Sequence, residues 1–170
     1  GVQPRCVQTD LIAKIIGCEN CMRTFRTKMV QQYVLDQLKT SKVSPENLRG
    51  FEHQNRVFGA EIMGTNALVT VCQATDGGDA CPVLAAWDKH SNIESRGNQI
   101  FEEFVKRLPG KSLLGGPYYW KVPFDSADPM NTPRDLDTGN NDVITAMKGA
   151  IAYLRSKNIP MNATWGSLQV

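Results

Sequence analysis

The stretch Cys81-Pro82-Val83-Leu84-Ala85-Ala86-Trp87-Asp88 decides the fold that this sequence predicts. It is a short, mostly apolar run with a proline near its start, which is typical of a buried helix over residues 82–87. Trp87 is its largest side chain, and a residue of that size tends to nucleate a core. We expect the apolar helix of residues 143–154 to pack against this run.

The composition is that of an ordinary globular domain. The chain has 170 residues, 41% hydrophobic and 21% charged, and one domain of this length can bury a substantial core. Its 19 basic and 17 acidic residues form no long block of one sign, which argues against nucleic-acid binding. No apolar run reaches the roughly 18 residues of a membrane span, and the first residues lack a signal-peptide layout. We expect one helical domain, residues 1–170, that contacts neither nucleic acid nor membrane.

The five cysteines fall into three groups: Cys6 alone, Cys18 with Cys21, and Cys72 with Cys81. Cys72 and Cys81 bracket a polar, glycine-rich turn, so a disulfide between them is geometrically easy, and it indicates an oxidising compartment. Cys18 and Cys21 have the C-x-x-C spacing, but they lack a second zinc-ligand pair and the surroundings of a thioredoxin-like redox site. We interpret one of them as bonded to the other or to Cys6, which leaves one cysteine without a partner inside the chain.

The N-terminal part predicts an irregular lead-in and a long amphipathic helix. Residues 1–21 contain at most one short helix, at 9–16, that ends at a glycine. Over residues 22–38 the apolar positions recur every three or four residues, so we expect them to form a stripe that faces the core. Lys28 falls with the polar residues on the opposite face.

A second helix begins at Ser44 and Pro45. Serine is a preferred N-cap and proline a preferred first helical residue, and an acidic residue follows in the first turn. We expect this helix to continue to about Cys72, with Gly59 and Gly64 marking a close helix crossing or a break.

The C-terminal half predicts two further helices separated by a long loop. Ser95 is expected to cap a helix over residues 96–108, which brings Phe101 and Phe104 into the core with Trp87. The last helix is expected over about residues 141–157, because its apolar residues form one stripe.

Residues 109–141 are rich in glycine, proline and aromatic residues, and we expect a long loop that lies over a neighbouring surface, with Trp120 in the core. Residues 165–170 look like a turn that enters a β-strand, so we expect the fold to continue past Val170 in a larger protein. The predicted fold is therefore mainly α, with about five helices, and it ends at the start of a strand.

The sequence offers few candidates for chemistry. No motif places a serine or cysteine where it could act with His53 or His90. We interpret His53 as a surface or packing residue and His90 as a solvated residue of a polar loop. The sequence contains no glycine-rich phosphate loop, no G-x-S-x-G and no H-E-x-x-H, and we expect no cofactor.

Four aspartates in the long loop raise the question of calcium. Their spacing does not match an EF-hand, and aspartate before proline favours turns for local hydrogen-bonding reasons, so we expect no metal site from Asp125, Asp128, Asp135 and Asp137.

An ordered set of short motifs resembles the β-subunit of the penicillin acylase family of N-terminal-nucleophile hydrolases, in its acyl-homoserine-lactone acylase and aculeacin A acylase branch. The motifs are ACPVLAAWD at 80–88, NIESRG at 92–97 followed by Phe101 and Phe104, WKVPFD at 120–125, Thr132-Pro133, Ile159-Pro160 and WGSLQV at 165–170, preceded by RTK at 26–28 and NRVFGAE at 55–61. The likeness covers most of the chain, and residues 1–21 match only loosely.

The resemblance implies a periplasmic or secreted amide hydrolase that cleaves an acyl chain from an amine such as homoserine lactone. In that family the serine that begins the β-subunit is the nucleophile and its own α-amino group the base. This serine lies upstream of the matched region, so the resemblance implies that no catalytic residue maps here and that the helices pack against the remainder of the acylase, its catalytic sandwich and α-subunit. The resemblance also fits a disulfide between Cys72 and Cys81.

Three hypotheses follow. The chain is a noncatalytic helical portion of an acylase and is inactive by itself, or it is a free-standing helical interaction module, or it is an enzyme in its own right that uses His53 or a free cysteine. A large exposed apolar patch would favour the first hypothesis over the second, because a segment separated from its partner leaves its contact face bare.

Overall fold

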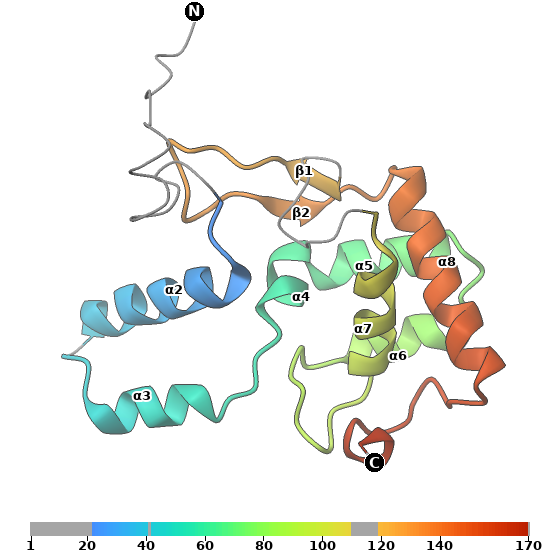
Figure 1. Ribbon diagram of the computed structural model, residues 1–170, viewed down its shortest axis with the longest axis horizontal. Coiled ribbons are helices and arrows are strands. Elements are labelled where there is room, and N and C mark those ends of the chain that lie inside the picture. The colour runs from blue at the N-terminus through green and yellow to red at the C-terminus, as the bar shows by residue number, and fades with distance from the viewer. Residues whose placement is uncertain (1–21, 41, 110–118, 170) are drawn as a thin grey trace, which may run out of the picture.

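The computed structural model describes residues 22–40, 42–109 and 119–169, and these residues form a mainly α-helical structure (Figure 1). Along the chain the elements are α2 (Phe25–Thr40), α3 (Pro45–Glu52), α4 (Phe58–Met63), α5 (Thr65–Gln73), α6 (Ala80–Ala86), α7 (Asn98–Arg107), β1 (Trp120–Val122), β2 (Arg134–Leu136), α8 (Asn141–Ser156) and the 3-10 helix η2 (Gly166–Leu168). The mainly α fold expected from the sequence is confirmed. The helix expected at residues 9–16 lies outside the described residues.

The core lies among α5, α6, α7 and α8. Trp87, Phe101, Phe104 and Trp120 are all at most 4% exposed, and the ring of Trp87 lies 5.3 Å from that of Phe101. Helix α8 contributes a buried stripe from Val143 to Leu154, as its apolar spacing predicts. This stripe packs chiefly on α7 and α5, whereas α6 packs chiefly on α5. The 81–88 run and α8 belong to one hydrophobic core, as expected, although each packs chiefly on other helices.

The single helix expected from Ser44 to Cys72 is divided into α3, α4 and α5. Its start is as predicted: Asn47 N–H donates to Ser44 Oγ, and Ser44 N–H donates to the Asn47 side chain. The division between α4 and α5 falls at Gly64, whose φ of +86° is a conformation that side-chain-bearing residues rarely adopt. Gly59 lies at a close crossing of α4 with α2, the other role expected for these glycines. A Cβ at Gly59 would lie 3.2 Å from the Phe25 ring.

Helix α7 begins two residues later than predicted, and Gly97, not Ser95, is its N-cap. Gly97 has φ +110°, and a Cβ on it would lie 3.0 Å from Cβ of Trp87. The backbone reversal at Gly97 therefore brings the start of α7 directly against Trp87. Ser95 is instead buried, and its hydroxyl donates to Asp88 Oδ2 at 3.1 Å.

The loop expected over residues 109–141 contains a short antiparallel hairpin in its described part. Trp120 pairs with Leu136 and Val122 with Arg134. In the expected C-terminal turn, residues Gly166–Leu168 form η2, and Gln169 after it is extended. Backbone N–H groups of Trp165 and Gly166 donate to the carbonyls of residues 95 and 93.

Helix α2 is the clearest departure from expectation. The apolar stripe predicted to face the core is largely outside it: Val30 is 42% and Leu38 60% exposed. The buried residue of α2 is Lys28, which was placed on the polar face and is 1% exposed. Only the first turns of α2 reach the body of the molecule, where the ring of Phe25 meets that of Trp120 edge-on at 6.0 Å.

Candidate functional site

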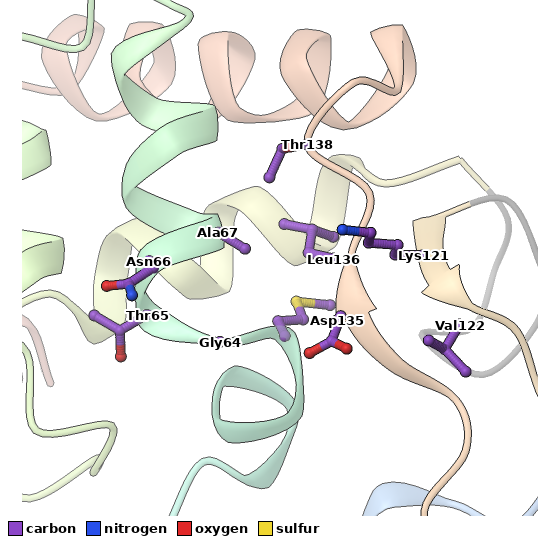
Figure 2. A pocket seen from close by; sticks show the side chains of 10 residues that line it. Gly64, Thr65, Asn66, Ala67, Lys121, Val122, Asp135, Leu136 and Thr138 are labelled. Carbon is purple, nitrogen blue, oxygen red and sulfur yellow. The ribbon is translucent and has the colours of Figure 1, made fainter.

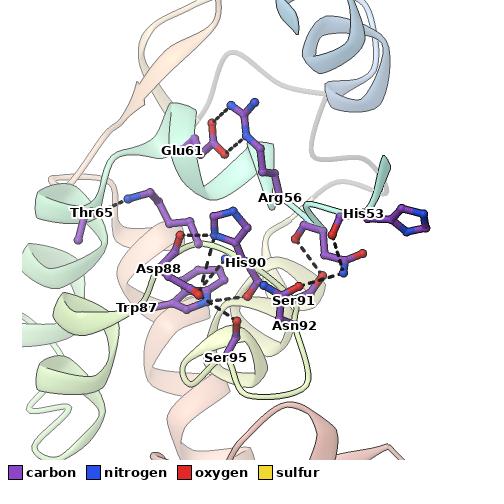
Figure 3. Close-up of polar contacts among 12 residues, drawn as sticks. His53, Arg56, Glu61, Thr65, Trp87, Asp88, His90, Ser91, Asn92 and Ser95 are labelled. Atoms are coloured by element: carbon purple, nitrogen blue, oxygen red, sulfur yellow. Dashed lines mark hydrogen bonds and ion pairs between the residues drawn. The ribbon is translucent and has the colours of Figure 1, made fainter. Parts of the chain in front are cut away.

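The histidine, serine and aspartate of the 88–95 loop form a hydrogen-bonded cluster (Figure 3). His90 N–H donates to Asp88 Oδ1 at 2.9 Å, and His90 Nδ1 lies 2.7 Å from the Asp88 carbonyl oxygen. The Ser95 hydroxyl donates to the Asp88 carboxylate and not to the imidazole, so the serine–histidine hydrogen bond of a histidine-activated nucleophile is not formed here. Trp87 Nε1 donates to the carbonyl oxygen of His90 at 2.9 Å, which fixes the loop to the core. The cluster is therefore a loop-organising network.

His53 stands apart from that cluster. It is exposed at the end of α3, and Figure 3 shows its ring pointing away from His90 and Ser95. The hydrogen bonds found for His53 involve its backbone: its N–H donates to the Arg49 carbonyl at 3.3 Å, and Asn55 Nδ2 donates to its carbonyl oxygen at 3.4 Å. The structure thus does not bring either histidine together with a nucleophile among the residues described.

Two segments far apart in sequence are joined beside the cluster. Val57 N–H donates to the Lys89 carbonyl at 2.8 Å, and Arg56 and His90 form an isolated antiparallel bridge. Arg56 binds both carboxylate oxygens of Glu61, at 2.8 and 2.6 Å. The hydrogen bond to Glu61 raises the pKa of the Arg56 guanidinium above its usual value, and this ion pair orders the chain that enters α4.

The most unusual titratable group is Lys28, which sequence periodicity placed on the solvent side. Its Nζ donates to the carbonyl oxygen of Thr132 at 2.6 Å and so fastens α2 to the turn between β1 and β2. Burial lowers the pKa of the Lys28 ammonium, and nearby Asp128 partly opposes this. In the sequence alone, Lys28 cannot be distinguished from a lysine on the surface of a helix.

Two of the four aspartates considered for calcium accept hydrogen bonds within turns. Asp125 Oδ1 accepts from Ala127 N–H at 2.8 Å, and Asp128 Oδ1 accepts from Asn131 Nδ2 at 2.7 Å. In the part of the chain that the structure describes, no three His, Cys, Asp or Glu residues are grouped to hold a metal ion.

An open hollow of about 520 Å³ lies between the α4–α5 junction and the hairpin (Figure 2). Lys121 and Asp135 are the charged side chains among its described lining residues, and the others are small, hydroxyl, amide or apolar. The described lining residues include no histidine, cysteine or serine.

Cys72 and Cys81 form a disulfide, with their Cα atoms 5.6 Å apart. The bridge joins α5 to α6, and Gly77 lies so close that a Cβ on it would be 2.5 Å from the Cys72 sulfur. Arg155 of α8 donates to the carbonyl oxygen of Gly77 at 2.9 Å and pairs with Asp79. The turn that the cysteines bracket is thereby held between three helices.

The described residues thus form a helical scaffold whose polar groups stabilise loops, and none of the helices found among them is long and apolar enough to cross a membrane. Comparison with known proteins identifies the kind of scaffold. The family model described as penicillin amidase matches residues 6–170. This chain therefore belongs to the penicillin amidase family.

Particular relatives are acylases. The acyl-homoserine lactone acylase PvdQ of Pseudomonas syringae pv. syringae (strain B728a) is 30% identical over 147 residues, which cover 80% of this chain and 18% of that protein. The corresponding protein of Pseudomonas syringae pv. tomato is 29% identical, covering 82% of this chain and 19% of its own length. The aculeacin-A acylase of Actinoplanes utahensis is 28% identical, covering 81% and 18%. This chain spans slightly less than a fifth of the length of these relatives.

Proposed function

We propose that this chain is a helical, noncatalytic part of an N-acyl amide hydrolase that releases acyl chains from amines such as N-acyl homoserine lactones. The observation that supports the proposal most strongly is the match to the penicillin amidase family over residues 6–170, together with relatives that are named as acylases. The reaction adds water across an amide, giving a carboxylate and an amine.

The noncatalytic role is supported by what the polar groups of the described residues do. The Ser95 hydroxyl donates its hydrogen bond to Asp88, and Asp88 also contacts the backbone nitrogen and the ring Nδ1 of His90. His53 is solvent-exposed, and no serine or cysteine contact is found for its ring within the described ranges. The proposed nucleophile is the N-terminal serine of the parent β-subunit, with its α-amino group as base.

The proposed location is the periplasm or the cell exterior. Its support is the Cys72–Cys81 disulfide, because such bonds persist in oxidising compartments.

The test compares two purified proteins in one assay. The isolated chain and the parent protein expressed from the full reading frame are each incubated with a long-chain N-acyl homoserine lactone, and free homoserine lactone is quantified. We expect turnover by the parent and none by the isolated chain. Turnover by the isolated chain would assign catalysis to residues 1–170, and no turnover by either protein would contradict the proposed substrate class.

A further inference from the structure

The outward side of α2 presents an apolar strip that the rest of the described chain does not bury. Val30, Val34 and Leu38 follow one another at i, i+4 and i+8, which places them on one face of the helix. We call these three residues the outer α2 face. Val30 is 42% exposed and Leu38 60% exposed, and Val34 is half-buried.

This face does not meet the body of the domain. Val30 lies about 200° around the helix from Lys28, which is buried against the Thr132 carbonyl, and Leu38 lies in the last turns of α2, beyond those that reach the body. In Figure 1, α2 and α3 lie together beside the α4 to α8 body, which α2 approaches with its first turns. The face that does not meet the body is therefore available to another surface.

The pair formed by α2 and α3 is held firmly enough to present that face. The rings of Tyr33 and Phe51 stack at 4.0 Å, and the Tyr33 hydroxyl donates to the Asn47 carbonyl at 2.5 Å. The edge-on contact of Phe25 with Trp120 and the Lys28 hydrogen bond fix the other end. An interface built on such a preorganised pair needs little ordering on binding.

Exposed apolar residues and positive charge both concentrate on this pair. Among the described residues, four of the six large apolar side chains that are exposed lie on it, namely Val30, Leu35, Leu38 and Leu48. Leaving the buried Lys28 aside, residues 22–53 carry five basic and three acidic residues, a net +2. The complementary surface is thus apolar at its centre and acidic at its rim.

We propose that the outer α2 face is the surface on which the remainder of the acylase polypeptide packs. This inference rests on the proposed function. The length of the relatives indicates what covers this face. The span that matches this chain is 18% and 19% of the two Pseudomonas syringae proteins, so each relative is more than five times longer than the matched span. A family member of that size supplies a large intramolecular partner, and neither a membrane nor a second copy is needed to cover the face.

The test places a photo-cross-linking residue in the parent protein. p-Benzoylphenylalanine is introduced at Leu38 and, as the matched control, at Asp36, which is also exposed on α2 but lies about 200° around the helix. After irradiation, cross-linked peptides are identified by mass spectrometry. We expect the Leu38 probe to join peptides of the parent that lie outside residues 1–170, and the Asp36 probe to give far fewer such products.

Three results would overturn the proposal: Leu38 cross-links confined to residues of this chain, cross-links between two copies, or equal yields from both positions. A second measurement guards against perturbation by the probe. Val30→Ser with Leu38→Ser should lower the melting midpoint of the parent and leave that of the isolated chain unchanged, whereas equal shifts in both proteins would contradict it. Acylase activity of the unmodified parent is assayed separately. A parent that is inactive but gives the expected cross-links would refute the proposed acylase function and would still support the proposed packing surface.

Discussion

Removal of the Cys72–Cys81 disulfide should destabilise the isolated chain by an amount that its loop length sets. The two cysteines are separated by nine positions. In the chain-entropy description, closing a loop of that length in the unfolded state corresponds to about 2.6 kcal/mol at 25 °C. For a domain of 170 residues this loss lowers the melting midpoint by roughly 5 to 10 °C.

The assay is urea unfolding of Cys72→Ala/Cys81→Ala, followed by far-UV circular dichroism, beside the unmodified chain with and without a thiol reductant. Alanine is the suitable replacement because both cysteines are buried and an unpaired buried hydroxyl would add its own cost. The reduced chain should lose a similar amount of stability to the double variant.

The double variant also serves as the control for effects of the reductant on the other cysteines, because it retains Cys6, Cys18 and Cys21. If the bridge is responsible, reductant destabilises the unmodified chain much more than the double variant. A double variant that loses less than about 0.5 kcal/mol would refute the reasoning, since that is the ordinary range for surface substitutions.

Three further changes test individual features. Burial lowers the pKa of Lys28 in the folded state, so the unfolded chain binds more protons between that pKa and about 10.5, and the unfolding free energy should rise with pH across that window. Lys28→Met should remove this rise, and parallel profiles for both proteins would contradict the burial. Gly97→Ala should cost about 2 kcal/mol in urea unfolding because of its φ of +110° and the adjacent Trp87, whereas Gly50→Ala, with open space around it, should be neutral or stabilising. His53→Ala and His90→Ala in the parent should each retain its kcat/KM for acyl homoserine lactone, and a large loss from either would place that histidine in the chemistry.

The sequence correctly predicted the elements that depend on interactions between residues close together in the chain. The cap at Ser44 and Pro45, the short helix before Trp87 and the apolar stripe of α8 all appear as expected, because caps and a helical period act within a few residues. The Cys72–Cys81 bridge belongs to the same group, since its turn is short.

Features that depend on distant contacts could not be predicted in this way. Lys28 is buried where the Thr132 carbonyl, 104 residues away, accepts a hydrogen bond from its ammonium group. The helical period that places Val30 and Leu38 on one face does not indicate whether a partner covers that face. Strands β1 and β2 have three residues each, which is too short for an alternating pattern to be recognised.

The candidate site could be predicted only in outline. Residue types alone indicated that His53 and His90 lack a nucleophile, and the geometry around Asp88 shows what occupies His90 and Ser95 instead. The family followed from the order of several motifs along the chain, since each of them is a packing or turn element and none has chemistry of its own.

The location of the reactive serine in the parent protein decides whether residues 1–170 take part in catalysis. A long-chain alkyl fluorophosphonate is added to the active parent, the modified serine loses its proton as fluoride leaves, and the labelled peptide is sequenced by mass spectrometry. The account predicts a label outside residues 1–170, on the serine that begins the β-subunit. A label on any serine within residues 1–170, with loss of activity, would contradict it.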